Sequence, residues 1–534
     1  MGDAADHPGH DDASWSTVRD RLLTGWDRGE LAPDQLDQLA EARFWLNDPQ
    51  GSIEVWMAAH RGWLDADRPD RAVRAAWRLF YEHWLVGEAA VARGWLARAR
   101  RLVTDEAGGP QGWLALAEAD VAAADGDLAE AVALAARAQR IGTDVGDDDL
   151  RAMGLQAEGR HLIAAGDRTA GLARLDEAMI SVIGDPLDPL FVGWIYCNVI
   201  STCHAVGDLR RANEWSVTAL RWCASLRDGR LYPGLCRVYA AELACLRGDL
   251  VEAEQSARQA CDDLLAFDRR YAGAAHHLLG EVCRLQGRRD EAAASFAAAE
   301  ELGHRPQPGL ALLRADQGVL DEAVAALRSA AAAESAPLPR LQLLSALVEV
   351  ADRAGDRSQL AAAVAETEAA AEVVPSELGS AYGAAARGRL AAGLADADTA
   401  AAELRAAAAR FDELGLELEA ARARARLAEA LADAGDRATA ELAAAAAARV
   451  LADLEATASD GEATAAKTMG PPLTERERTV LALVAGGATN RDVAERLHLS
   501  HHTVARHLAN SCTKLGVRGR AAAVAAAYAR GLLD

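Results

Sequence analysis

A short turn built on glycine recurs along most of this chain at nearly constant intervals. The turn is usually a Gly-Asp pair, as at Gly126-Asp127, and successive turns lie 31 to 42 residues apart, mostly 39 to 41. A fixed period of this length is typical of a solenoid, in which each repeat is a pair of helices that packs against its neighbours. The turns lie at Gly87, Gly126, Gly166, Gly207, Gly248, Gly287, Gly318, Gly355, Gly393 and Gly435, preceded by Asn47-Asp48-Pro49.

Small residues follow the same period. Alanine occupies the positions five and twelve residues after most turn glycines, as in Ala131 and Ala138 after Gly126. A methyl side chain at these places lets neighbouring helices approach closely, whereas a larger one would separate the backbones. We therefore expect these alanines to be buried at helix crossings. The other pairs are Ala92 and Ala99, Ala212 and Ala219, Ala253 and Ala260, Ala292 and Ala299, Ala323 and Ala330, and Ala440 and Ala447.

One repeat carries a recognisable consensus in Leu279, Gly280, Cys283, Gly287, Ala292, Phe296 and Ala299. This window resembles the tetratricopeptide (TPR) repeat. Most other units are longer than a standard TPR and are more similar to the extended helical repeats of MalT-type regulators. The predicted fold class is all-α, with a TPR-like solenoid of about eleven helix pairs followed by a small four-helix domain.

All twelve tryptophans fall within the first 222 residues, and some keep the repeat spacing. Trp45 and Trp84 are 39 residues apart, as are Trp56 and Trp95. Equivalent positions in successive repeats are most simply core positions. The alternative is that the aromatic half of the solenoid, roughly residues 30–285, lines a concave surface for a ligand or a protein partner.

Composition and the N-terminus exclude several other classes of protein. Hydrophobic residues make up 51% of the chain and charged residues 26%, which is typical of a globular protein. No apolar run approaches the ~18 residues of a membrane helix, and the acidic N-terminus lacks the basic and apolar regions of a signal peptide. We therefore expect a cytoplasmic protein with no membrane partner.

The eight cysteines favour free thiols over a metal site or a disulfide framework. Seven of them lie between Cys197 and Cys283, and none forms a Cys-x-x-Cys motif. Their spacings fit neither a zinc site nor a small disulfide-bonded scaffold. We expect buried thiols within helices, no metal and no cofactor.

A segment without periodicity separates the repeats from the C-terminal region. Its residues are small and polar and end in Gly-Pro-Pro, which is typical of a flexible linker. The expected organisation is an N-terminal tail with a capping helix at 1–29, the solenoid at 30–455, the linker at 456–472 and a C-terminal domain at 473–534.

The C-terminal residues 473–534 predict several short helices. Thr474 and Glu477 form a capping box, in which the hydroxyl accepts a hydrogen bond from the Glu477 amide and the carboxylate accepts one from the Thr474 amide. The turn between a second helix (489–497) and a third (501–515) is very short. Two helices joined so closely, with an amphipathic one following, are typical of a helix-turn-helix.

A dense set of motifs runs through this C-terminal region. The motifs are Leu473-Thr474-x-Arg476-Glu477, Gly487-x-x-Asn490-x-x-Val493-Ala494-x-x-Leu497, Ser500-x-x-Thr503-Val504-x-x-His507, and Lys514-Leu515-Gly516-Val517 with Arg520. With these motifs the region resembles the LuxR-type DNA-binding domain over about 60 residues. The resemblance implies binding to double-stranded promoter DNA as a homodimer, with Val524 and Tyr528 of the last helix at the dimer interface.

The third predicted helix has two distinct faces. Val504, Leu508 and Leu515 recur at helical spacing, with Ser511 or Cys512 between them, and form the inner face. Serine at position 511 departs from the isoleucine usual in the family. Only the outward face at the N-terminal end of such a helix reaches base edges in the major groove. The candidate base contacts are Arg506, which suits guanine, and His502, Ala505 and Ala509.

Residues around this helix are candidates for phosphate contacts, which position a protein on DNA without reading its sequence. The alternative for Arg506 is a solvated surface arginine. The histidines between positions 498 and 507 follow no ligand spacing, so no metal site is expected here. The candidate phosphate contacts are Thr503, Arg491, Lys514, Arg518 and Arg520.

The net charge of −23 is unevenly distributed. Residues 471–534 carry a net charge of +4 and the rest of the chain −27, so a basic region suited to DNA follows an acidic solenoid. The preferred interpretation is a transcriptional regulator whose solenoid senses a ligand or protein partner, with RNA polymerase as one candidate partner. The alternative is a TPR-type interaction scaffold with a weak or non-functional helix-turn-helix.

Two further classes are disfavoured. An ATP-driven regulator of the MalT-like class needs a P-loop, and the nearest match, Gly461–Thr468, lacks the second glycine and a preceding strand. No pair of nucleophile and base and no pair of carboxylates stands out from the repeats, so we do not expect an enzyme.

Overall fold

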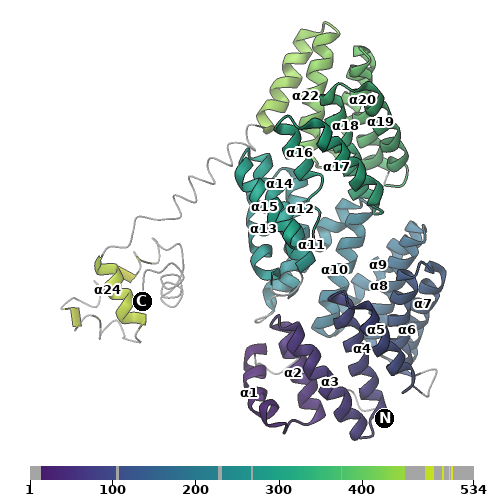
Figure 1. Cartoon of the computed structure of the whole chain (residues 1–534), viewed down its shortest axis with the longest axis vertical. Coiled ribbons are helices and arrows are strands. Elements are labelled where there is room, and N and C mark those ends of the chain that lie inside the picture. Colours follow the sequence, from purple (N-terminus) through teal and green to yellow (C-terminus); the bar gives the residue numbers. More distant parts are fainter. Residues whose placement is uncertain are drawn as a thin grey trace. The chain divides into compact units, whose positions relative to one another are not determined.

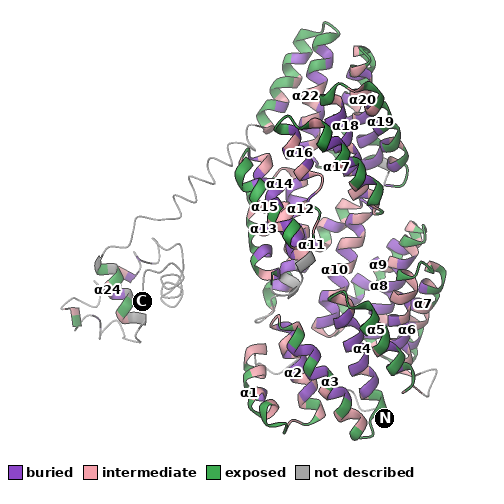
Figure 2. Cartoon of the chain, viewed as in Figure 1, coloured by how far each residue is buried: buried purple, intermediate pink, exposed green. Residues whose placement is uncertain are grey.

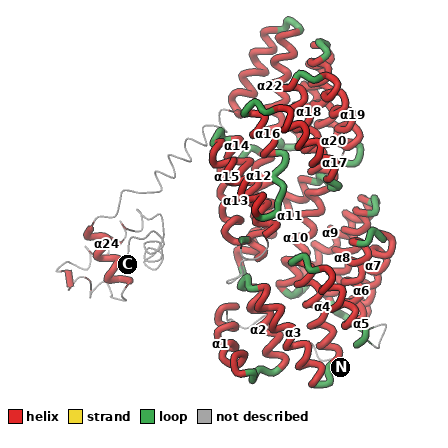
Figure 3. The backbone as a smooth tube through the Cα atoms, in the orientation of Figure 1, coloured by secondary structure: helices red, strands yellow, loops and turns green. Residues whose placement is uncertain are grey.

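The computed structural model describes residues 14–103, 108–226, 231–265, 269–374, 376–451 and 475–485, together with Val493, Arg496, Leu497, Val504, His507, Leu508 and Ser511. The chain divides into two compact units, residues 1–451 and 452–534. All regular secondary structure in the described residues is helical (Figure 3), so the prediction of an all-α fold is confirmed. None of the described helices is long and apolar enough to cross a membrane.

The first unit is a succession of helices in which each packs against the next (Figure 1). Residues 437–451 continue the series as a further helix. The helices of its first half are α1 (Trp15–Arg28), α2 (Pro33–Trp45), α3 (Pro49–Asp65), α4 (Pro69–Leu85), α5 (Ala89–Arg100), α6 (Gly109–Ala124), α7 (Leu128–Val145), α8 (Asp148–Ala164), α9 (Arg168–Gly184), α10 (Pro189–Ala205) and α11 (Leu209–Ser225). Those of its second half are α12 (Leu231–Arg247), α13 (Leu250–Leu264), α14 (Arg269–Leu285), α15 (Arg289–Glu301), α16 (Gly309–Asp316), α17 (Leu320–Ala333), α18 (Pro337–Ala354), α19 (Arg357–Ala371), α20 (Ser376–Gly393), α21 (Ala397–Glu413) and α22 (Glu417–Asp433).

The Gly-Asp turns combine a left-handed glycine with a helix cap. Gly126 has φ +87°, a conformation that costs glycine little because it has no Cβ. The carboxylate of the next residue, Asp127, accepts a hydrogen bond of 3.1 Å from the Glu130 amide and caps α7. Gly393 does not follow the prediction, because it is the last residue of α20 and Ala395 adopts the left-handed conformation, with φ +62°.

The alanines that follow the turns lie where neighbouring helices meet. All of the predicted pairs are buried except for Ala330, which is half-buried. Buried residues recur along the helices of the solenoid (Figure 2). Close approach also explains Gly280 of the TPR-like repeat, because a Cβ there would lie 2.6 Å from the Phe296 ring.

The tryptophans with the repeat spacing belong to the core. Trp45 and Trp56 are 2% exposed, and the half-buried Trp84 and Trp95 pack against core clusters. At the centre of the aromatic half, the Trp77 ring contacts other aromatic rings edge to face, with centroid distances of 4.6 Å to Trp113 and 4.7 Å to Tyr81. This packing favours the core interpretation of the aromatic half.

The even-numbered helices form the inner layer of the solenoid. From α4 to α22, each contacts the next even-numbered helix. The array also curves back on itself, since α10 contacts α18 and α12 contacts α22. The curvature of the solenoid therefore brings helices that are far apart in the sequence into contact.

The cysteines agree with the expectation of free thiols. Cys203, Cys223, Cys236, Cys245, Cys261 and Cys283 are buried and Cys197 is half-buried, all without a disulfide. Cys512 lies outside the described residues. Within the part of the chain that is described, no group of three or more His, Cys, Asp or Glu side chains has the geometry to hold a metal ion.

Candidate functional site

The second unit contains helix α24 (Glu475–Ala485), the first of the predicted C-terminal helices. Val480 on this helix is fully buried, as is Val493 from the predicted second helix. A guanidinium nitrogen of Arg476, Nη2, donates a hydrogen bond of 3.0 Å to the carbonyl oxygen of Leu497. Arg476 therefore ties the start of α24 to the end of the second helix.

The predicted inner face of the third helix is buried where the structure describes it. Val504 and Ser511 are fully buried and Leu508 is 7% exposed, a spacing of four and three residues that fits one face of a helix. The Ser511 hydroxyl donates a hydrogen bond of 2.8 Å to the carbonyl oxygen of His507. A serine is tolerated here because its polar group has a partner within the helix.

All of the predicted DNA-contact and dimer residues lie outside the described residues, so their roles stay predictions. The same holds for Thr474 of the predicted capping box and for Leu515 of the inner face. The base-contact candidates are His502, Ala505, Arg506 and Ala509, the phosphate candidates Arg491, Thr503, Lys514, Arg518 and Arg520, and the dimer candidates Val524 and Tyr528.

Comparison with known proteins identifies this unit. Residues 471–527 match the model of the family described as bacterial regulatory proteins, luxR family. The chain is 41% identical over 64 residues to the spore germination protein GerE of Bacillus subtilis (strain 168), which is 86% of the length of GerE. This chain belongs to the LuxR family. Its C-terminal unit is therefore a LuxR-type helix-turn-helix, the DNA-binding domain of transcription regulators.

Other LuxR-family relatives share only this domain with the chain. The Fimbriae Z protein of Salmonella typhimurium (strain LT2) is 48% identical over 46 residues, which are 9% of this chain and 22% of that protein. The response regulator protein VraR of Staphylococcus aureus is 39% identical over 62 residues, 12% of this chain and 30% of VraR. The chain thus spans less than a third of these two relatives.

The chain is similar to a solved structure described as the APC/C hetero-tetramer Cut9–Hcn1. The similarity covers 83% of this chain and 93% of that one, with 12% sequence identity and a TM-score of 0.36.

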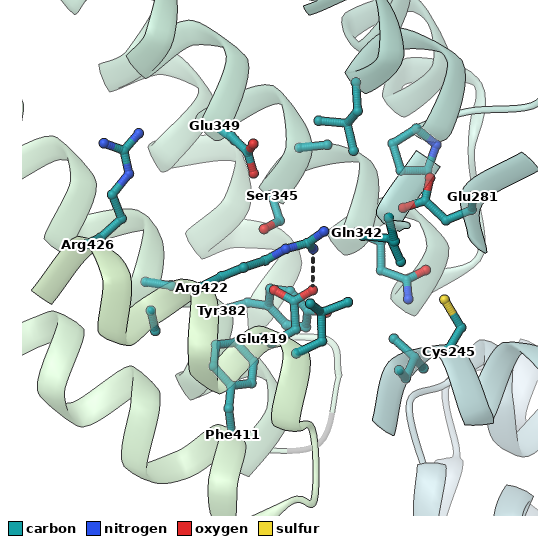
Figure 4. Close-up of a pocket in the computed structure, with 18 of the residues that line it drawn as sticks. Cys245, Glu281, Gln342, Ser345, Glu349, Tyr382, Phe411, Glu419, Arg422 and Arg426 are labelled. Atoms are coloured by element: carbon teal, nitrogen blue, oxygen red, sulfur yellow. Dashed lines mark hydrogen bonds and ion pairs between the residues drawn. The ribbon is translucent and has the colours of Figure 1, made fainter. Parts of the chain in front are cut away.

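The inner layer of the solenoid lines a cavity of about 160 Å³ in its second half (Figure 4). The lining residues come from α12, α14, α18, α20 and α22, with additions from α16 and α21. The cavity therefore lies mostly beyond the aromatic half that the sequence singled out. A signal existed in α18, where Gln342, Ser345 and Glu349 place polar groups on one face of a helix whose other positions are largely apolar.

Arginine and glutamate side chains from several helices meet at this cavity. Arg284 Nη2 lies 2.6 Å from Glu281 Oε1, and Arg389 Nη1 lies 3.3 Å from Asp352 Oδ2. Burial acts to raise the pKa of Glu281, but Arg284 and other nearby cations outweigh it and lower this pKa to about 2. Glu281 is therefore held in its ionised form by the arginines around it.

A pair of histidines lies at the edge of the same cavity. Nδ1 of His277 lies 3.1 Å from Nε2 of His304. Burial lowers the pKa of both rings, to about 4 for His304, where the nearby His277 adds to the effect. Both imidazoles are therefore neutral at pH 7, and the charge of the cavity comes from its carboxylates and guanidinium groups.

Proposed function

We propose that this protein is a transcriptional regulator whose C-terminal domain binds double-stranded promoter DNA and whose solenoid senses a small ligand or a protein partner. The observation that carries the proposal is the LuxR-family match over residues 471–527. Burial of Val504, Leu508 and Ser511 supports it, because the third helix of a helix-turn-helix must pack on one face to present the other.

The roles of individual residues follow from this buried face. At about 100° per residue, positions 505, 506 and 509 turn away from the inner face. We place Arg506 against a guanine edge and His502, Ala505 and Ala509 against neighbouring bases. We assign phosphate contacts to Arg491, Thr503, Lys514, Arg518 and Arg520. We assign the pairing of two DNA-binding domains to Val524 and Tyr528.

The remaining parts of the proposal concern organisation and partners. We propose that residues 456–472 link the solenoid (30–455) to the DNA-binding domain (473–534). A root-mean-square reach of about 20–25 Å follows for a flexible linker of this length. Since promoters are the target, the protein would act in the bacterial cytoplasm, with RNA polymerase as a candidate protein partner.

Binding of the full chain to DNA tests the proposal. A genome-wide footprint supplies a cognate site, and fluorescence anisotropy then compares this duplex with a scrambled one between 50 and 200 mM salt. A working domain should prefer the cognate duplex, with an affinity that falls steeply as salt rises. If neither duplex is bound even at low salt, the chain is instead a TPR-type scaffold with a non-functional helix-turn-helix.

A further inference from the structure

The cavity in the second half of the solenoid is lined by helices that are far apart in the sequence. Helix α22 returns to contact α12, and Arg426 of α22 forms an ion pair of 2.9 Å with Asp352 of α18. Because the cavity exists only when six successive inner helices, α12 to α22, are stacked in one curvature, a ligand bound in it would stabilise that curvature.

Arg422 of α22 is the central polar group of the cavity. Its side chain extends across the space, and its Nη1 atom donates a hydrogen bond of 2.8 Å to Glu419 Oε1 (Figure 4). Within the described part of the chain, Glu419 is its only hydrogen-bond or ion-pair partner. A guanidinium group has five N–H donors, so most of those on Arg422 remain for a ligand such as a carboxylate.

Glu349 of α18 supplies the opposite charge. Its nearest cations are Nη2 of Arg389 at 3.8 Å and Nη1 of Arg353 at 3.9 Å, both longer than a hydrogen bond. Burial acts to raise the pKa of Glu349, but Arg389 and Arg422 are the first of several cations that outweigh it and lower this pKa. Glu349 is thus an ionised acceptor, suited to an ammonium group.

The lining also contains uncharged polar groups. Gln342, Ser345 and the Tyr382 hydroxyl have no hydrogen-bond partner among the described residues. Much of the remaining wall is apolar, and the Tyr382 and Phe411 rings meet edge to face with centroids 5.2 Å apart. The apolar lining includes Leu246, Leu278, Leu312, Leu404, Phe411 and Leu418.

The balance of charge limits what this space accepts. The lining contains four glutamates and three arginines, and both histidines beside it are neutral. A dianion such as a phosphate ester would add to the carboxylate excess, and a polyamine would meet the guanidinium groups. A ligand with one charge of each sign and an apolar remainder avoids both costs.

We propose that this cavity binds an apolar α-amino acid, with its carboxylate on Arg422, its ammonium group facing Glu349 and its side chain against the apolar wall. The proposal rests on the sensing role of the solenoid proposed above and names the chemical class that is sensed.

Isothermal titration calorimetry of the full chain tests the proposal with L-leucine and L-phenylalanine as probes. Each of two analogues, 2-phenylethylamine and 3-phenylpropionate, lacks one charge of phenylalanine. We expect saturable binding of at least one amino acid, and binding about 10- to 100-fold weaker for Arg422→Gln and for Glu349→Gln, because each loses a charged hydrogen bond. The matched control is Arg424→Gln on the same helix, since Arg424 pairs with Asp412 and does not line the cavity.

Three results would overturn the proposed ligand class. They are no binding of either amino acid at concentrations up to about 10 mM, analogues that bind as tightly as phenylalanine, or equal losses in Arg424→Gln and Arg422→Gln. If Arg422→Gln does not fold, Glu349→Gln tests the same proposal. The DNA-binding assay separates this inference from the proposed function. Promoter binding without amino-acid binding removes only the inference, whereas amino-acid binding that leaves DNA affinity unchanged keeps the site and removes its sensing role.

Discussion

The Tyr81 hydroxyl donates a hydrogen bond of 2.7 Å to Oδ2 of Asp120, and the two residues are one repeat, 39 positions, apart. Nη2 of Arg160, a further 40 positions along, donates a bond of 2.5 Å to Oδ1 of the same carboxylate. Side chains on α4, α6 and α8 thus join three successive inner helices. Burial acts to raise the pKa of Asp120, but Arg160, His161 and Tyr81 together hold it well below its usual value.

Replacing Asp120 by alanine should destabilise the solenoid strongly. The half-buried Arg160 and the buried His161 would lose the carboxylate they share, which should lower the free energy of unfolding by about 2–4 kcal/mol, whereas Tyr81→Phe removes one hydrogen bond and costs about 1–2 kcal/mol. Thermal unfolding followed by circular dichroism measures both. Asp125→Ala is the control, because its ion pair with Arg93 is exposed to solvent. Equal effects of Asp120→Ala and Asp125→Ala would contradict this role of the buried network.

The buried carboxyl group of Glu82 should make the solenoid less stable as the pH rises. Its Oε1 atom accepts a hydrogen bond of 3.0 Å from the Ser52 hydroxyl, and its side chain is 2% exposed. Burial raises the pKa of Glu82 to about 7, above its ordinary value near 4.5. The folded state therefore holds this proton more tightly than the unfolded state. The resulting stability is fully present below about pH 4.5 and is lost as the pH rises through about 7, by up to about 2–3 kcal/mol.

Unfolding temperatures at pH 5 and pH 8 check this dependence. Glu82→Gln keeps the shape of the protonated group and should reduce the difference between the two temperatures. Asp144→Asn changes an exposed carboxyl group and should leave the difference as it is in the unmodified chain. An unchanged difference in Glu82→Gln would show that Glu82 titrates normally.

The periodic alanines should differ in how well they tolerate a larger side chain. Ala299 and Ala330 both lie twelve residues after a turn glycine, but Ala299 is fully buried and Ala330 is half-buried. Leucine at position 299 should lower the free energy of unfolding by about 1–3 kcal/mol, because neighbouring helices must separate. Leucine at position 330 should lower it by less. Urea denaturation of the two variants measures the difference. Equal losses would mean that the half-buried position is packed as tightly as the buried one.

Local patterns predicted the repeats well because each repeat depends on nearby residues. The Gly126-Asp127 turn needs a left-handed residue and a cap, and both requirements can be read within a few positions. The turn predicted at Gly393 was wrong, because the left-handed residue of that turn is Ala395, two positions later.

The cavity could not be predicted in the same way. It forms where α22 returns to α12, and this return depends on small rotations accumulated over five repeats. Neither Arg422 nor Glu349 belongs to a motif. They line the same cavity only because the curvature of the solenoid brings α22 and α18 together. The inner face of the C-terminal third helix could be predicted because Val504 and Leu508 recur at local helical spacing, and the structure buries Ser511, one of the two residues that the sequence left open for the next position.

Arg506 and Lys514 should affect DNA binding in different ways. If Arg506 binds a guanine through two hydrogen bonds, Arg506→Ala should weaken binding to the cognate duplex by about 1–3 kcal/mol and much less to a scrambled one. If Lys514 contacts a phosphate, Lys514→Ala should weaken both about equally and reduce the salt slope by about 1. Arg478→Ala on α24 is the control for charge, because it removes one exposed cation from the same unit and should leave the preference for the cognate site unchanged. Anisotropy titrations at two salt concentrations distinguish these outcomes. An equal loss on both duplexes in Arg506→Ala would mean that this side chain does not read a base.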